Sequence, residues 1–168
     1  MKICPLFKKF QSEAGFTLVE VSLVLAIFTI LVSLTTINFI RPNREAIFSK
    51  TSDELIATIR EAQEKSIAGF STNNVASENF GIHFENDSFT LFRGTTFIEG
   101  EPWNFKTTLP NNLEFSVINL PSPDLVFNRG SGEIINFNPT QRRVTLRDKE
   151  TGNLRNFIFN FLGVTNVQ

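Results

Sequence analysis

The stretch EAGFTLVEVSLVLAIFTILVSLTTINFI, residues 13–40, decides the class of the N-terminal part of the chain. Between Phe16 and Ile40 the only charged side chain is Glu20. As a helix this run would be roughly 37 Å long at about 1.5 Å per residue, and it exceeds the roughly 20 residues that are needed to cross a hydrocarbon layer. We therefore predict a transmembrane helix over residues 16–41.

The residues that flank the apolar run predict its orientation. Three lysines precede it and Arg41 follows it. A cleaved secretory signal has a shorter apolar core with a small-residue cleavage site after it, whereas here the small residues Ala14 and Gly15 come before the run. A basic leader and an uncleaved span predict a cytoplasmic N-terminus and an exported remainder. The basic residues in the leader are Lys2, Lys8 and Lys9.

Glu20 is the unusual residue of the apolar run. A charge at the centre of a bilayer costs roughly 2.5–3.5 kcal/mol, and a position near the cytoplasmic end lowers that cost. Taken alone, Glu20 would be an interfacial residue without a role. Its neighbours, GFTLVE at residues 15–20, indicate more than that.

GFTLVE after a basic leader resembles the class III signal peptides of type IV prepilins and type II secretion pseudopilins. The resemblance implies that residues 1–15 form a leader, which a prepilin peptidase removes after Gly15, and that Phe16 is then N-methylated. It also implies that the chain is held in the cytoplasmic membrane and later enters a filament at the periplasm or cell surface. The implied partners are the peptidase, other subunits, the membrane and an inner-membrane assembly platform.

Cleavage after Gly15 would give Glu20 a charged partner. It creates an ammonium group on Phe16, and in a bundle of such helices that cation can meet the Glu20 carboxylate of a neighbour. An opposite charge in a low dielectric offsets much of the desolvation cost of each group. We therefore interpret Glu20 as a residue that sets the register of assembly.

Beyond Pro42 the chain returns to an amphipathic helical pattern, which we assign to residues 42–69. Six residues recur at steps of three and four along one face, and Gly69 is a suitable residue to end the helix. We predict that this face packs on a sheet. Its residues are Phe48, Ser52, Leu55, Ile59, Ala62 and Ser66.

Residues 70–168 have the pattern of short strands. Segments with two-residue alternation are separated by turn residues and prolines, and NDS (86–88) and DKETGN (148–153) are typical of hairpin turns. The predicted fold is α+β, with a long helix packed on an antiparallel β-sheet domain. The candidate strands cover residues 80–85, 89–93, 103–109, 113–118, 125–128, 133–138, 142–147 and 153–161.

The order of these segments resembles the H-type minor pseudopilins and the FimT-like minor pilins. The similarity lies in the helix ending ATIREAQEKSIAG, the hairpin FGIHFENDSFTLF, the segment LVFNRGSGEI and the closing RNFIFNFLGVTNV. The final glycine is followed by VTNVQ without the basic residue often seen there. The disulfide loop common in major pilins is also excluded, because Cys4 is the only cysteine.

No residue pattern indicates catalysis or metal binding. His83 is the only histidine and has no cysteine nearby, which argues against a zinc site, so we expect a surface or half-buried strand residue. Asp87, Asp148 and Glu150 lie in turn sequences with too few spaced oxygen ligands for a calcium loop. We predict a protein that is not an enzyme and needs no cofactor or metal.

One basic cluster sits near the last predicted hairpin, with Arg129 upstream. In FimT-like minor pilins, basic surface residues can bind DNA during natural transformation, and phosphate contacts need such a patch. Because acidic residues are interspersed and the net charge of the chain is −1, we interpret the cluster as a solvated strand face. A DNA-binding minor pilin stays the alternative to a structural subunit, and a membrane protein unrelated to pili is disfavoured by GFTLVE. The cluster comprises Arg142, Arg143, Arg147, Lys149 and Arg155.

Overall fold

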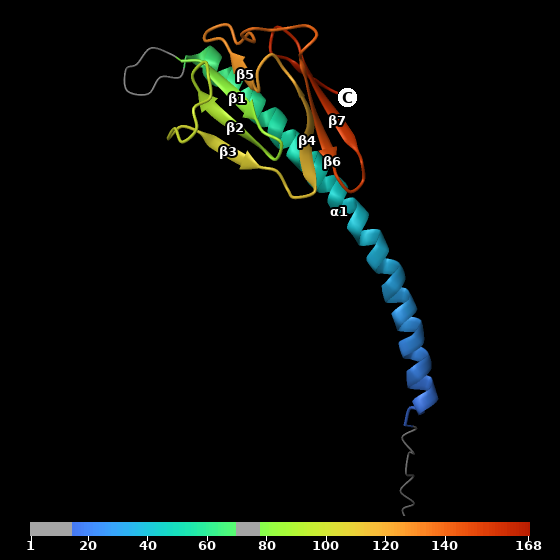
Figure 1. The fold of residues 1–168 in the computed structure, drawn as a ribbon. Helices are drawn as coiled ribbons and strands as arrows, with labels where there is room; N and C mark the ends of the chain where they lie inside the picture. The colour runs from blue at the N-terminus through green and yellow to red at the C-terminus, as the bar shows by residue number, and fades with distance from the viewer. Residues whose placement is uncertain (1–14, 70–77) are drawn as a thin grey trace, which may run out of the picture. The chain divides into compact units, whose positions relative to one another are not determined.

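The computed structural model of the protein describes residues 15–69 and 78–168, with the side chains of residues 34–42 outside that description. Most of the predicted leader, residues 1–14, therefore lies outside the described residues. The chain divides into two compact units, Met1–Arg44 and Glu45–Gln168. The helix α1, Leu18–Ala68, contributes to both units (Figure 1), and its backbone stays helical at Pro42.

The second unit contains the amphipathic part of α1. The predicted stripe is confirmed, because all six of its residues are buried and Thr51 joins them. Two buried hydroxyls on this face, those of Ser52 and Ser66, donate hydrogen bonds to the carbonyls of Phe48 and Ala62 one turn earlier. The helix ends at Ala68, and Gly69 follows with a φ of 64°, a left-handed conformation that glycine adopts without steric cost.

Strands of the second unit form two antiparallel sheets. The first sheet has the order β3-β2-β1-β5. Its β1–β2 hairpin is confirmed, with Phe84 opposite Phe89 and with the N–H of Glu85 bonded to the Ser88 carbonyl across the turn. The strands of this sheet are β1 (Phe80–Phe84), β2 (Ser88–Arg93), β3 (Phe105–Thr108) and β5 (Asp124–Phe127).

The second sheet has the order β4-β6-β7-β8. The predicted turn at residues 148–153 joins β6 to β7, and the carboxylate of Asp148 accepts the N–H groups of Glu150 and Thr151 in it. Asp148 is therefore a structural residue of the turn. The strands of this sheet are β4 (Leu113–Asn119), β6 (Arg143–Asp148), β7 (Leu154–Phe159) and β8 (Thr165–Val167).

One strand prediction was wrong. Residues 133–138 form no strand and make only isolated bridges at Ile134 and Asn138. The backbone turns at Asn136, whose φ is 56°, and the N–H of Ile134 bonds to Phe161 while that of Ile135 bonds to Val126. Because these donors face different neighbours, the segment cannot continue a single ladder.

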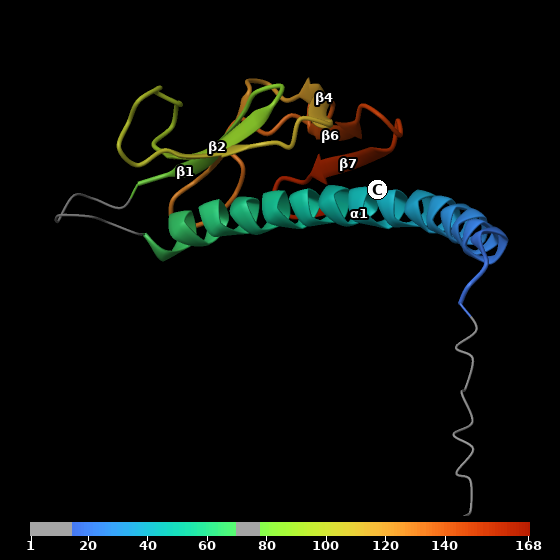
Figure 2. The same cartoon turned by 90° about the horizontal axis from the view of Figure 1, so that it is seen from below.

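The buried half of α1 lies along one side of both sheets (Figure 2). Near its C-terminal end, the N–H of Phe80 in β1 donates to the Ser66 hydroxyl. Nearer its start in this unit, the guanidinium of Arg155 in β7 lies over the ring of Phe48. Helix and sheets therefore enclose one core, whose residues all lie between Phe48 and Phe159.

Phenylalanine dominates this core. Phe84, Phe89, Phe127, Phe157 and Phe159 are almost completely buried. A phenyl ring adds a large apolar area without a hydroxyl that needs a partner. Among the described residues, no buried side-chain nitrogen or oxygen lacks a hydrogen-bond partner, so the buried polar groups of this described core are satisfied.

Candidate assembly helix and domain surfaces

The start of α1 is built by a side-chain cap. Thr17 precedes the first helical residue, and its Oγ1 accepts a hydrogen bond from the backbone N–H of Glu20 at 3.2 Å. This is the contact of an N-cap residue with the third residue of a helix. Thr-x-x-Glu is also the sequence of a capping box, so Glu20 occupies the first turn, where a negative charge is stabilised by the helix dipole.

The three predicted processing and assembly residues lie together at this end of the helix. Gly15 and Phe16 precede the helix, and Glu20 is in its first turn. The Phe16 side chain is 81% exposed, and a Cβ built at Gly15 would meet no atom within 4 Å. The peptide bond between Gly15 and Phe16 is therefore on an open, non-helical segment.

Apolar side chains are exposed all around this part of α1. They include residues spaced by one, two and three positions, so they do not form a single stripe. A helix that is apolar on every side is stable only when other apolar groups cover it. Within the described part of the chain, no helix is both long and apolar enough to cross a membrane. The exposed residues are Leu18, Val19, Val21, Leu23, Val24, Leu25, Ile27, Phe28, Ile30, Leu31 and Val32.

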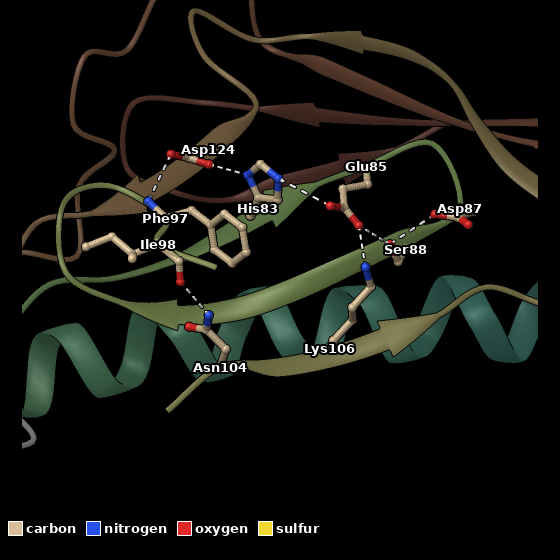
Figure 3. A network of polar contacts seen from close by, with 9 residues as sticks. All are labelled: His83, Glu85, Asp87, Ser88, Phe97, Ile98, Asn104, Lys106 and Asp124. Atoms are coloured by element: carbon tan, nitrogen blue, oxygen red, sulfur yellow. Dashed lines mark hydrogen bonds and ion pairs between the residues drawn. The ribbon is translucent and has the colours of Figure 1, made fainter. Parts of the chain in front are cut away.

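In the second unit, the described polar network of Figure 3 centres on His83. The Nδ1 of His83 lies 2.6 Å from an oxygen of Asp124 in β5, and since a carboxylate only accepts, this nitrogen donates. The other oxygen of Asp124 accepts the N–H of Phe97, whose ring stacks on the imidazole at 4.1 Å between centroids. His83 is thus half-buried, as predicted, and fixes the loop between β2 and β3.

The same network continues to Glu85. Its carboxylate accepts hydrogen bonds from Lys106 and from Ser88, both at 2.6 Å. These bonds, the one from Lys106 first, lower the pKa of Glu85 below its ordinary value, and the bond to Glu85 raises the pKa of Lys106. Asp87, in the predicted turn, accepts a longer bond from Ser88 at 3.2 Å.

The basic cluster is divided between two faces of the second sheet. In the β6–β7 pairing, Arg155 is opposite Leu146 and packs over Phe48, on the side of the helix. Arg143 and Arg147 are exposed on β6, whose alternate residues Val144 and Leu146 are buried. Successive strand residues point to opposite faces, so Arg155 does not share a surface with Arg143 and Arg147.

Two members of the cluster also have acidic or backbone partners. Arg147 forms an ion pair with Glu114 in β4, and Lys149 lies 3.9 Å from the same carboxylate and donates to the Asn111 carbonyl. Arg142 and Arg143 are exposed, and no described residue forms an ion pair with either. DNA binding stays a prediction, and this division favours the solvated strand face.

The comparisons with known proteins bear on the N-terminal segment. Residues 11–36 match the family model described as the prokaryotic N-terminal methylation motif. The chain carries a type IV pilin-like methylation motif. The match covers Gly15, Phe16, the capped helix start and all of the exposed apolar residues from Leu18 to Val32. Neither the curated proteins nor the solved structures include a match to this chain.

Two features were missed at the sequence level. The first is the Thr17 cap, which the pattern Thr-x-x-Glu predicts. It was missed because Glu20 was interpreted only as a charge in an apolar run. The second is the conformation of the loop 94–104. No local sequence pattern predicts it, because it depends on contacts of Phe97 with His83 and Asp124, which are distant in sequence.

Proposed function

We propose that the protein is a structural subunit, a minor pilin or pseudopilin, of a type IV pilus or type II secretion filament. A prepilin peptidase cuts it between Gly15 and Phe16, and Phe16 is N-methylated. Until assembly, residues 16–41 hold it in the cytoplasmic membrane with the N-terminus in the cytoplasm. The β-rich domain is exported and decorates the filament.

One observation carries this proposal: the methylation motif coincides with a helix that exposes apolar side chains on all sides. Two environments cover such a surface, namely lipid before assembly and neighbouring helices afterwards. A motif on a helix with one apolar stripe would instead be packed against its own domain. The same segment therefore supports both membrane retention and assembly.

The open geometry before the helix supports processing at Gly15. A peptidase must bind its substrate in an extended form, and residues 15–17 are not helical. The absence of a side chain at Gly15 lets the backbone come close to the enzyme. After the cut, the new ammonium group on Phe16 lies about one helical turn before Glu20 of the same chain. The Glu20 carboxylate of a neighbouring subunit would then pair with this ammonium group.

The fold of the second unit supports the proposal that the chain is a filament subunit with an exported globular domain. The α+β fold, with the amphipathic half of one long helix packed on antiparallel sheets, is consistent with a pilin-like fold. The minor-subunit role rests on the resemblance to H-type and FimT-like proteins. In this account the chain is the substrate of two enzymes, for cleavage and for methylation.

The proposal is tested by following the chain into filaments. Filaments are sheared from cells that make the wild-type chain or Gly15→Leu, and both are labelled with an antibody to the β-rich domain. We expect labelled filaments for the wild type and membrane-retained chain for Gly15→Leu. Equal labelling of both would overturn the proposal. Deleting the gene while scoring piliation, secretion and transformation together then identifies the machine.

A further inference from the structure

The second unit contains a small hollow whose lining is largely apolar. The buried side chains of Leu125 on β5, Ile134 and Phe159 on β7 contribute to this lining. Exposed Ser122 and Asn136 also line the hollow, so it opens to solvent. Its volume is about 130 Å³, whereas sites for cofactors and drug-sized molecules have about 300–1,000 Å³. The hollow therefore suits a guest group of about the size of one apolar side chain.

An unusual backbone conformation shapes one wall of this hollow. Asn136 has a φ of 56°, in the left-handed region that residues other than glycine rarely adopt. Two backbone hydrogen bonds hold the residues before it, because the N–H of Ile134 donates to the Phe161 carbonyl and that of Ile135 donates to the Val126 carbonyl. Such conformations persist where the surrounding structure enforces them, and they gather at ligand sites. This wall therefore has the character of a binding site.

Arg142 adds a cation to the rim of the hollow. The N–H of Phe159 donates to the Arg142 carbonyl at 2.9 Å, so the arginine lies directly beside one of the apolar lining residues. Arg142 is exposed and lines the hollow, whereas Arg143 does not line it. Successive residues of an extended segment face opposite sides, which explains this difference. No described residue forms an ion pair with Arg142, so its guanidinium is available to a guest.

The rim beside Arg142 is a hydrogen-bonded turn. Asn138 and Gln141 both line the hollow. The backbone N–H of Gln141 donates to the Asn138 carbonyl at 3.1 Å, and the side-chain amide of Asn138 donates to the side-chain oxygen of Gln141 at 3.0 Å. The side-chain nitrogen of Gln141 has no acceptor among the described residues, so it can donate to a guest. Because the turn is already ordered, binding there costs less entropy.

One carboxylate, that of Asp124, also lines the hollow, but its oxygens are engaged by other residues. As Figure 3 shows, one oxygen accepts a hydrogen bond from Nδ1 of His83 and the other accepts the backbone N–H of Phe97. The polar groups that remain for a guest are the donors of Arg142 and Gln141. A guanidinium with a neighbouring amide N–H favours a carboxylate.

We propose that the hollow binds the C-terminus of a polypeptide that ends in an aliphatic residue. The last side chain enters the apolar space, and the free carboxylate of the same residue pairs with Arg142 and accepts the amide N–H of Gln141. Only a C-terminal residue carries a backbone carboxylate beside its own aliphatic side chain, and capture of this group is a recurring mode of peptide recognition. The inference goes beyond the proposed filament role, because binding needs neither cleavage nor assembly.

The test measures peptide binding to the full chain, purified in detergent micelles, by fluorescence anisotropy. The probe is a fluorescein-labelled peptide of sequence GSGSGL with a free C-terminal carboxylate. Two matched probes carry a C-terminal amide or end in serine in place of leucine. We expect saturable binding of the first probe and about tenfold weaker binding of each of the others, since one loses the charge-assisted hydrogen bonds and the other loses the apolar contact.

Variants of neighbouring arginines assign the binding to the hollow. Arg142→Gln should weaken the first probe about tenfold and abolish the difference between carboxylate and amide, whereas Arg143→Gln should bind like the wild type. Both positions are exposed, and circular dichroism checks that the fold is retained. Absence of saturable binding, equal binding of the amide probe, or equal effects of the two variants overturns the inference. The assay involves no filament, so such a failure leaves the proposed function intact.

Discussion

The hydroxyl of Thr17 accepts the backbone N–H of Glu20 at 3.2 Å, which fixes where the helix begins. The cap places the carboxylate of Glu20 in the first turn, five residues after Gly15, where we propose that the leader is cut. A residue that looks costly in an apolar segment is therefore stabilised by the positive end of its own helix, and in the proposed function it would also meet the ammonium of a processed neighbour.

The first prediction separates these two roles of Glu20. Glu20→Gln removes the charge but keeps a side chain that serves a capping box, so we expect normal processing and a large loss of filament incorporation, because a neighbour's ammonium is left unpaired. Thr17→Ala keeps the charge and loses the cap, at a cost of about 0.5–2 kcal/mol to the helix start. Quantitative blotting of sheared filaments measures both variants. Unchanged incorporation of Glu20→Gln would refute the register role.

The second prediction concerns the packing of α1 on the sheets. Leu55 is 1% exposed in the buried stripe, and Leu55→Ala should lower the free energy of unfolding of residues 45–168 by about 2–5 kcal/mol. Glu54→Ala, at the exposed neighbouring position, is the control and should change it by about 0.5 kcal/mol or less. Urea denaturation followed by circular dichroism measures both. Equal effects would mean that the stripe does not form the core contact.

The third prediction compares two glycines with similar backbone conformations. Gly163 has a φ of 80°, and an added Cβ would lie 2.5 Å from Nε2 of Gln63 and 2.9 Å from a ring carbon of Phe127. Gly152 has a φ of 74° and nothing within 4 Å. Gly152→Ala should cost about 1–2 kcal/mol for its left-handed conformation, and Gly163→Ala should cost clearly more. Thermal unfolding of both variants checks this, and equal costs would show that the contact with Gln63 is loose.

A fourth prediction follows from the lowered pKa of Glu85. Because the folded pKa lies below the ordinary value of 4.5, ionised Glu85 stabilises the fold above that pH and loses this effect as the pH falls through the lowered pKa. The difference in free energy of unfolding between wild type and Glu85→Gln should therefore be constant near neutral pH and shrink in acid. For Lys106, whose pKa is raised above 10.5, the loss comes as the pH rises past that value. A difference that grew on acidification would contradict the network in Figure 3.

The fold was predictable where local pattern and tertiary contact agree. The buried helix stripe from Phe48 to Ser66 follows from the spacing of its residues, and the β1–β2 hairpin follows from its turn composition. In the helix, the face that the spacing predicts to be buried is the face that is buried. The pairing of β5 with β1, and of β4 with β6, was not predictable, since both pairs join strands that are not neighbours in the sequence. The sequence predicted an antiparallel β-sheet domain, and the structure shows that its strands form two sheets.

The two errors in the strand prediction, at residues 133–138 and at β8, have a common cause. Residues 133–138 are apolar enough for a strand, but their donors bond to two different segments, Val126 and Phe161. The short strand β8, Thr165–Val167, was missed because its three residues carry no periodic signal and pair only with β7. In both places distant backbone contacts decide the conformation.

The position of the candidate processing segment was predictable from the sequence, but the arrangement of the basic cluster was not. Gly15, Phe16 and Glu20 stand out because their order matches a processing signal, and the methylation motif covers them. The basic cluster looked continuous only in the sequence, since Arg155 and Arg147 occupy adjacent strands on alternate faces. Whether neighbouring strand residues share a surface depends on register, which composition does not encode.

The most direct test of the account is the mass of the mature N-terminus. The chain is purified from membranes of cells that contain a prepilin peptidase, and its N-terminal peptide is analysed by mass spectrometry, with Gly15→Leu as the control. The account predicts a chain that begins at Phe16 and carries one added methyl group, and a Gly15→Leu chain that keeps its leader. A wild-type chain that retains residues 1–15, or that is cut elsewhere, would contradict it.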